Sequence, residues 1–273
     1  MNERLHLYQQ HLYTFETCPR RFYLRYLARV PWPEAPLEPG LESAYDHGRR
    51  FHRWVERDFL GLPVADESDT DPTLRRWWSI YQSRRPALPP GQRFVETTLT
   101  IPTGREGRHT LSGRFDLIVV GEGEDGRPSA AIYDWKTGEP RDIGRLRRAW
   151  QTRVYLAVLA EGGAALVPDK PEAFAPGRLS FTYWYIEDPE HPRVIRYDEA
   201  AHRRNMAELE ALVGRIDEQL TAGEWPLTDS LAECRHCAYQ AHCDRRTAGE
   251  PLLAELDEDA PEPDEEWLEP QWG

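Results

Sequence analysis

The amino-acid sequence predicts an α/β fold in which a mixed central sheet is flanked by helices. The first observation is a block of three β-rich runs between residues 92 and 137, which glycine-containing turns separate. The second is that helix-forming patterns precede this block and follow it. The third is composition: 40% of the 273 residues are hydrophobic and ten are tryptophan, which supplies a core and excludes a chain disordered throughout.

The first part of the chain is expected to be mainly helical. Residues 3–29 have a helical pattern. The proline-rich connector VPWPEAPLEPG that follows must be a loop, because proline lacks the backbone N–H that regular structure needs. The spacing of apolar residues predicts two further helices, at residues 43–60 and 74–85.

The β-rich block is followed by a helix, two strands and a second helix. Valine, isoleucine, threonine and aromatic residues are frequent in the β-rich runs, as is typical of strands. The expected elements are strands at 92–101, 109–120 and 130–137, a helix at 143–160, strands at 178–188 and 193–197, and a long amphipathic helix at 199–223.

The formal net charge of −13 is concentrated at the C-terminal end. Ten of the 47 acidic residues and none of the 34 basic ones lie in residues 250–273, which leaves 37 acidic and 34 basic residues in 1–249. We expect residues 1–249 to form a single domain and residues 250–273 to be an acidic, disordered tail. Alternatively, the tail mimics nucleic acid and covers a basic groove, so the acidic composition does not exclude a nucleic-acid partner.

The sequence lacks the apolar segments that membrane insertion and export require. No run approaches the roughly 20 apolar residues of a membrane span. The first residues, MNERLHLYQQH, contain no apolar signal core. We therefore expect a cytoplasmic protein without a membrane partner.

Two aspartates and a lysine form the main candidate site. Asp134 and Lys136 are two residues apart on a predicted strand and therefore share one face. Asp116 lies in the preceding strand, and it comes close to Asp134 if the two strands pair. Paired carboxylates suit Mg²⁺ or Mn²⁺, and a lysine beside the ion can orient water or stabilise a phosphate. The alternative is a structural salt bridge. Lys136 is one of only two lysines against 32 arginines, which favours a task that needs an amine.

Four further residues have spacings or positions that are compatible with a role in this site. His52 lies four residues after Gly48 on a predicted helix, and Gln151 and Tyr155 are also four apart, so each pair shares a helix face. Glu96, in the first strand of the block, supplies another carboxylate. Each also has an ordinary interpretation. His52 can be a histidine of the core, Gln151 and Tyr155 can form an interface contact, and Glu96 can lie on an exposed strand face.

The cysteines are arranged like metal ligands. Cys18 lies near the start of the chain, and Cys234, Cys237 and Cys243 form a C-x₂-C-x₅-C pattern near the end. Disulfides are not expected in a cytosolic protein. Structural zinc is one interpretation, and His236 and His242 are close enough in sequence to take part.

Arginines alternate with aromatic residues after Cys18, where Arg21 is one of four arginines in the run RRFYLRYLAR. Guanidinium groups beside rings suit single-stranded DNA, because phosphates meet the charges and bases stack on the rings. A solvated arginine-rich surface is the alternative.

Four short segments together resemble the ordered motifs of the RecB-like branch of the PD-(D/E)XK nuclease superfamily: GRRFH (48–52), SGRFD (112–116), YDWKTG (133–138) and QTRVY (151–155). The resemblance implies a restriction-endonuclease-like core. It implies that Mg²⁺ or Mn²⁺ is bound by His52, Asp116, Asp134 and the Trp135 carbonyl. Lys136 would be the catalytic lysine beside the two aspartates. Gln151 and Tyr155 would steady the site or contact DNA.

The cysteine segments TCPRRFYLRY and CRHCAYQAHC resemble the two halves of the split 4Fe-4S site of iron–sulfur RecB-like nucleases. These nucleases include the CRISPR-adaptation exonucleases and nuclease domains of some bacterial recombination helicases. The resemblance implies a cluster that joins the N- and C-terminal helical parts, with zinc as the alternative metal.

These features predict a metal-dependent DNA exonuclease that acts on single-stranded DNA or DNA ends. Its expected setting is DNA repair, recombination or CRISPR spacer acquisition, with CRISPR-adaptation or recombination proteins as partners. The alternatives are a DNA-end binding or adaptor subunit with weak or partner-dependent cleavage, and a structural protein without nuclease activity. The sequence has no G-x₄-G-K-[S/T] phosphate loop, so no coupling to ATP is expected from this chain.

Overall fold

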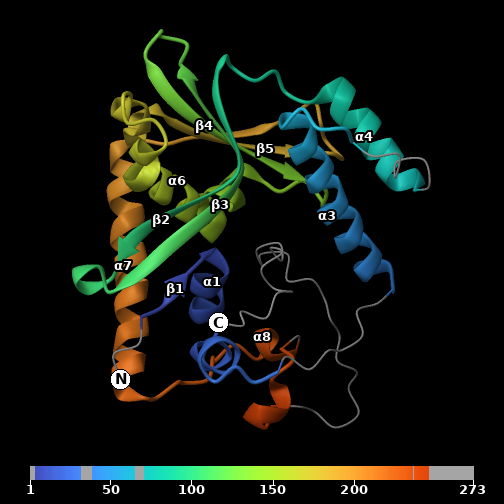
Figure 1. Ribbon diagram of the computed structural model, residues 1–273. Coiled ribbons are helices and arrows are strands. Elements are labelled where there is room, and N and C mark those ends of the chain that lie inside the picture. The colour runs from blue at the N-terminus through green and yellow to red at the C-terminus, as the bar shows by residue number, and fades with distance from the viewer. Residues whose placement is uncertain (1–3, 32–38, 65–70, 236, 246–273) are drawn as a thin grey trace.

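A computed structural model describes residues 4–31, 39–64, 71–235 and 237–245, without the side chains of residues 39–43. At its centre is a mixed six-stranded sheet (Figure 1). The strands are β1 (His6–Leu7), β2 (Gly91–Thr103), β3 (His109–Glu122), β4 (Pro128–Lys136), β5 (Leu179–Tyr185) and β6 (Arg193–Arg196). Their order is β1-β3-β4-β5-β6, with β2 paired to β3. The β1–β3 and β4–β5 pairs are parallel and the others antiparallel.

Helices cover both faces of the sheet (Figure 1). One face packs against α1 (Gln9–Thr17), α6 (Trp150–Gly162) and α7 (Glu199–Ala222), and the other against α3 (Pro39–Phe59) and α4 (Pro72–Arg84). β3 contributes to both layers: Ile118 and Val120 pack in the apolar cluster with α6, and Leu117 and Val119 in the cluster with α3 and α4, as alternation along a strand requires. The predicted α/β fold with a mixed, helix-flanked sheet is confirmed.

Aromatic side chains fill the layer between α3, α4 and the sheet. Trp184 is fully buried, and its ring lies 5.7 Å from that of Trp135 and 6.2 Å from that of Tyr81. Phe51 of α3 packs 6.0 Å from Tyr81 in the same cluster. Aromatic pairs at these distances add to the stabilisation that burial gives. The cluster fixes α3 against the end of β4, next to the candidate site.

Replacing Trp184 by alanine is expected to lower the free energy of unfolding by about 3–5 kcal/mol, because the truncation leaves a cavity in this cluster. Urea denaturation of both proteins measures the difference. Trp184→Phe, which keeps a ring, is expected to lose less, and Val194→Ala, at a side chain 43% exposed, to change stability by about 0.5 kcal/mol at most. A loss below about 1 kcal/mol for Trp184→Ala would contradict the buried role of this residue.

The structure corrects the prediction of continuous helix over residues 3–29. A short strand, β1, pairs with β3, and the helical part breaks at Cys18, whose φ of −159° and ψ of 108° are extended. The break follows from Pro19, because the residue before a proline is driven away from the helical region. Pro19 then opens α2 (Pro19–Phe22), and a π-helical turn over Tyr23–Leu27 follows.

The helix predicted at 143–160 is also divided, into α5 (Ile143–Arg148) and α6, at the extended residue Ala149. The Thr152 hydroxyl donates a hydrogen bond of 2.5 Å to the Leu146 carbonyl, so a carbonyl at the end of α5 is satisfied across the break. The division places Gln151 in the first turn of α6, where it reaches β4.

The other predicted helices and strands are present with small shifts of their ends. The C-terminal segment contains α8 (Leu231–Arg235) and a 3₁₀ turn (Gln240–Cys243). The predicted acidic tail and most of the proline-rich connector lie outside the described residues. In the described part of the chain, no helix combines the length and the apolar character that crossing a membrane requires.

Candidate active site and cysteine site

The pairing of β3 with β4 brings Asp116 next to Asp134. At this end of the pairing Leu117 lies opposite Tyr133, so Asp116 and Asp134 are the next two positions of the same register. At this position the Asp116 side chain, and not the β3 backbone, bonds to β4: its Oδ2 accepts a hydrogen bond of 3.0 Å from the Trp135 N–H. The two strands separate beyond this point, and the carboxylates lie where they part.

Asp134 and Lys136 share one face of β4, as their spacing predicts, and both side chains are buried. Lys136 Nζ lies 2.9 Å from Asp134 Oδ1, and Gln151 Nε2 donates a hydrogen bond of 2.7 Å to Asp134 Oδ2. Asp134 is thus held through both oxygens, one by the amine and one by the first turn of α6. Contacts of this kind fix the direction in which a carboxylate points.

His52 reaches the site from α3. Its Nδ1 lies 3.3 Å from Asp116 Oδ2. Close packing of α3 against the end of β4 makes this possible, because a Cβ atom on Gly48 would lie only 3.2 Å from Thr137 Oγ1. A glycine at this position lets the helix backbone approach. The Gly48–His52 spacing therefore has a structural reason on this helix.

Glu96 joins the same group from β2. Its neighbours Val95 and Thr97 pair with Leu117 and Phe115, so Glu96 lies opposite Asp116. Its φ of 45° is left-handed, an unfavourable conformation for a non-glycine residue that is often found at functional sites. In the described part of the chain, one set of three ligand atoms from His, Cys, Asp or Glu lies within 4.8 Å of one another, and it comes from His52, Glu96 and Asp116.

The pKa values of the two carboxylates of this set, Glu96 and Asp116, are shifted in opposite directions. Burial and the charge of Asp116 raise the pKa of Glu96 to about 8, although Arg114 and His52 act in the opposite direction. Burial also raises the pKa of Asp116, but His52 and Lys136 lower it by more, and its net shift is downward. Two close carboxylates of which one holds a proton are a typical site for a cation, whose charge allows both to ionise.

The remaining predicted site residues, Tyr155, Trp135 and Arg21, lie outside the ligand group. Tyr155 lies in the core, 3% exposed, with its ring 4.7 Å from Phe115 and 5.9 Å from Phe181. This position suits support of the sheet beneath the site and not contact with DNA. The Trp135 side chain is buried on the α3 face, and its backbone lies between Asp134 and Lys136. Arg21 does not lie in this group; it lines the cysteine pocket instead.

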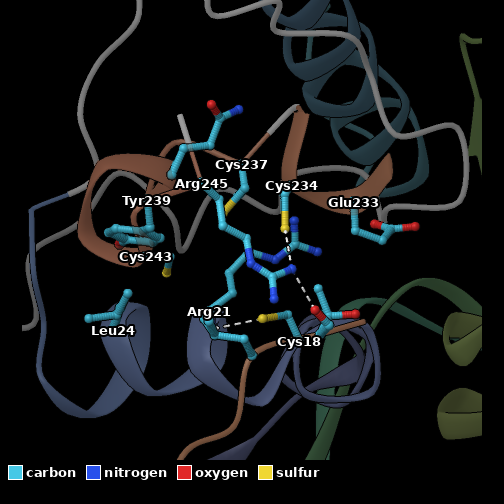
Figure 2. Close-up of a pocket in the computed structure, with 12 residues that line it drawn as sticks. Cys18, Arg21, Leu24, Glu233, Cys234, Cys237, Tyr239, Cys243 and Arg245 are labelled. Atoms are coloured by element: carbon cyan, nitrogen blue, oxygen red, sulfur yellow. Dashed lines mark hydrogen bonds between the residues drawn. The ribbon is translucent and has the colours of Figure 1, made fainter. Parts of the chain in front are cut away.

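The four cysteines line one pocket, although more than 200 residues separate the first from the others. Cys18 directly precedes α2, and the other three come from α8 and the segment that follows it, up to the end of the 3₁₀ turn (Figure 2). All four are free thiols. Burial raises the pKa of Cys237 and of Cys243, so thiolates here need a compensating positive charge.

The cysteine sulfurs are more widely spaced than a single zinc ion requires. Tetrahedral zinc with Zn–S bonds of about 2.3 Å holds its sulfurs roughly 3.8 Å apart. Among the described residues, no three cysteine sulfurs lie within 4.8 Å of one another. In this arrangement the four sulfurs are not gathered around the position of one zinc ion.

Comparison with known families agrees with the geometry. Residues 6–244 match the family model of the PD-(D/E)XK nuclease superfamily. A search of curated proteins gives no match. Nucleases of this superfamily use Mg²⁺ or Mn²⁺, in keeping with the histidine and carboxylate group at the ends of β3 and β4. The match covers most of the 273 residues and includes both cysteine segments. The chain belongs to the PD-(D/E)XK nuclease superfamily, which implies a metal-dependent nuclease.

Proposed function

We propose that the protein is a DNA exonuclease of the RecB-like branch that acts on single-stranded DNA or DNA ends. The observation that carries the proposal is the convergence of His52, Glu96 and Asp116 beside the contact between Asp134 and Lys136. The four segments that resemble the RecB-like motifs contain each of these residues except Glu96.

The donor set fits a divalent cation. His52, Glu96 and Asp116 have ligand atoms within 4.8 Å of one another, and Asp134 with the Trp135 carbonyl, which follow next to Asp116 on β4, would complete the set that holds the ion. An imidazole and hard carboxylate oxygens are ligands that Mg²⁺ and Mn²⁺ accept. When bound, the ion supplies Lewis-acid chemistry, because it lowers the pKa of water and neutralises charge on a phosphate.

We assign Lys136 the role of the catalytic residue that acts directly on the attacking water and the phosphate. Its ammonium is held by Asp134 in a buried position, where a positive charge acts strongly on a nearby phosphate oxygen. There it orients the attacking water and stabilises the charge that develops as the water oxygen bonds to phosphorus and the P–O bond to the leaving nucleotide breaks. Gln151 is a positioning residue, because it acts on the reaction through Asp134.

A helix end with exposed arginines comes shortly before Gln151 in the chain. Arg147 and Arg148 are exposed in the last turn of α5, three to four residues before Gln151. Exposed arginines bind phosphates without regard to sequence, as an exonuclease requires. We propose that this turn contacts the DNA backbone near the scissile phosphate.

For the cysteine site we propose a 4Fe-4S cluster, with zinc as the second candidate. The shared pocket and the wide spacing of the sulfurs support the cluster. Bound by Cys18, Cys234, Cys237 and Cys243, it would join the N-terminal helices to the C-terminal segment. Closing a loop of this length restricts the unfolded chain and stabilises the fold by roughly several kcal/mol.

The proposed setting is cytoplasmic DNA repair, recombination or CRISPR spacer acquisition, which the motif resemblance supports. A DNA-end binding or adaptor subunit with weak cleavage is the second candidate function, because the arginines of α5 are available for binding without catalysis. Residues 1–249 are proposed to act as one nuclease domain.

The activity is tested on end-labelled linear and circular single-stranded DNA with Mn²⁺. Progressive degradation of the linear substrate, with the circle intact, is the expected result. Removal of the metal with EDTA is expected to abolish cleavage, and excess Mn²⁺ to restore it. Cutting of the circle would show endonuclease activity instead, and binding without cleavage would favour the adaptor function.

Glu96 is expected to release a proton when the metal binds. Its pKa of about 8 lies above the ordinary 4.5, so at pH 7 the side chain is protonated and must lose about one proton to become a ligand. Titration calorimetry of Mn²⁺ binding in buffers of different ionisation enthalpy counts these protons. The release is expected to vanish as the pH rises above 8, and Glu96→Gln to release fewer protons at pH 7. Equal release from the wild type and this variant would exclude Glu96 as a ligand.

A further inference from the structure

Two arginine side chains enter the cysteine pocket from different segments. Arg21 comes from α2, and Arg245 from the end of the C-terminal segment. Figure 2 shows both side chains extending into the space between Cys18 and Cys234. Arg245 Nη1 donates hydrogen bonds to Cys234 Sγ, at 3.4 Å, and to the Thr228 carbonyl, at 2.7 Å.

Arg21 differs from the arginines around it. Arg20 and Arg25 lie over the rings of Tyr23 and Tyr26, at 5.9 and 5.5 Å. The Arg21 Nε atom is buried in the pocket and has no hydrogen-bond partner among the described residues. A buried N–H donor without an acceptor costs about 1–3 kcal/mol, so its place in the pocket indicates an acceptor that completes the site.

The charges in the pocket point to an anionic centre. Within the described part of the chain, neither Arg21 nor Arg245 forms an ion pair with a carboxylate, although Glu233 also lines the pocket. Two like charges in a half-buried pocket repel each other unless negative charge lies between them. Four thiolates around either a doubly charged cluster core or a zinc ion leave two negative charges, which two guanidinium groups balance.

We propose that Arg21 and Arg245 are the charge-compensating residues of the metal centre at the cysteines, an inference that rests on the proposed centre. Positive charge and hydrogen bonds at the sulfurs stabilise the more negative, reduced state of a cluster and raise its reduction potential. The same charges favour thiolates over thiols, and they thereby slow the loss of metal. Arg21 is thus a residue of the metal centre, and the DNA contact expected for it from the sequence is not needed to explain its position.

The test uses the full chain, reconstituted with iron and sulfide without oxygen. The variants are Arg21→Gln and Arg245→Gln, with Arg21→Lys and Arg245→Lys as variants that keep the charge. Arg235→Gln is the matched control, because Arg235 is exposed, lies next to Cys234 and does not line the pocket. Two quantities are measured: the midpoint potential, from the visible absorbance during redox titration, and the rate at which a chelator removes the metal.

Each glutamine variant is expected to shift the reduction equilibrium at least tenfold toward the oxidised cluster, about 59 mV for one electron, and to lose metal faster. The lysine variants and Arg235→Gln are expected to stay near the wild type, which separates charge from a mere effect on folding. Glutamine variants with the potential and release rate of the control would overturn the inference.

The experiment distinguishes a wrong 4Fe-4S assignment from a wrong role for the two arginines. A colourless wild type that contains zinc would overturn the 4Fe-4S assignment. The arginine inference then predicts faster zinc release from both glutamine variants, and release at the control rate would overturn it. A wild type that takes up neither metal at the cysteines would overturn both. DNA cleavage by the same samples tests the nuclease function independently.

Discussion

Replacing Lys136 by alanine is expected to lower kcat for DNA cleavage by about a thousandfold, or about 4 kcal/mol of transition-state stabilisation. The amine lies 2.9 Å from Asp134 in a buried site, and no other lysine lies near it in sequence. Removing it takes away both the donor that orients water and the charge that stabilises the phosphate. Single-turnover cleavage of end-labelled single-stranded DNA with saturating Mn²⁺ measures the loss.

Controls separate this effect from unfolding. Lys170→Ala removes the other lysine of the chain, which is exposed, and is expected to cleave like the wild type. Lys136→Arg keeps a charge but not a compact amine, so it is expected to remain at least tenfold below the wild type. Circular dichroism of each variant checks the fold. A Lys136→Ala protein that folds and cleaves within tenfold of the wild type would remove Lys136 from the reaction.

Replacing Asp116 by asparagine is expected to reduce cleavage by about a thousandfold or more, because it removes a negative charge from the centre of the ligand group. Asparagine keeps an oxygen that can accept the Trp135 N–H, so β4 should stay in place. Unlike Lys136→Ala, this variant is expected to lose Mn²⁺ affinity together with activity. Calorimetry and the cleavage assay at rising Mn²⁺ concentration measure both effects.

Asp125→Asn is the matched control for this change. Asp125 is also a carboxylate near β3 and β4, but it lies in the turn between them, where it pairs with Arg178. It is expected to keep both Mn²⁺ binding and cleavage. Asp116→Asn with wild-type metal affinity would show that the ion is held elsewhere.

The part of the site that could be predicted from the sequence lies on regular elements. Asp134 and Lys136 share a strand face, and Gly48 and His52 share a helix face, so spacing alone places each pair. The β3–β4 pairing followed from the turn between two β-rich runs. These predictions concern residues that are close in sequence, and the fixed repeat of a helix or a strand determines which of them share a face.

The parts that the sequence did not show depend on long-range packing or on local backbone breaks. The sequence offers Glu96 as a further carboxylate but does not show where it lies, and its left-handed φ and its place opposite Asp116 appear only in the folded chain. Tyr155 shares a helix face with Gln151, yet the depth at which α6 packs buries it. The breaks at Cys18 and Ala149 depend on single residues within otherwise helical patterns.

The most direct test of the central claim is the position of a bound metal ion. Crystals grown with Mn²⁺ and measured at its absorption edge give an anomalous peak at the ion. We predict a peak between His52, Asp116 and Asp134, within about 2.0–2.4 Å of their ligand atoms and close to the Lys136 amine. A peak elsewhere, with these side chains free of the ion, would contradict the proposed active site.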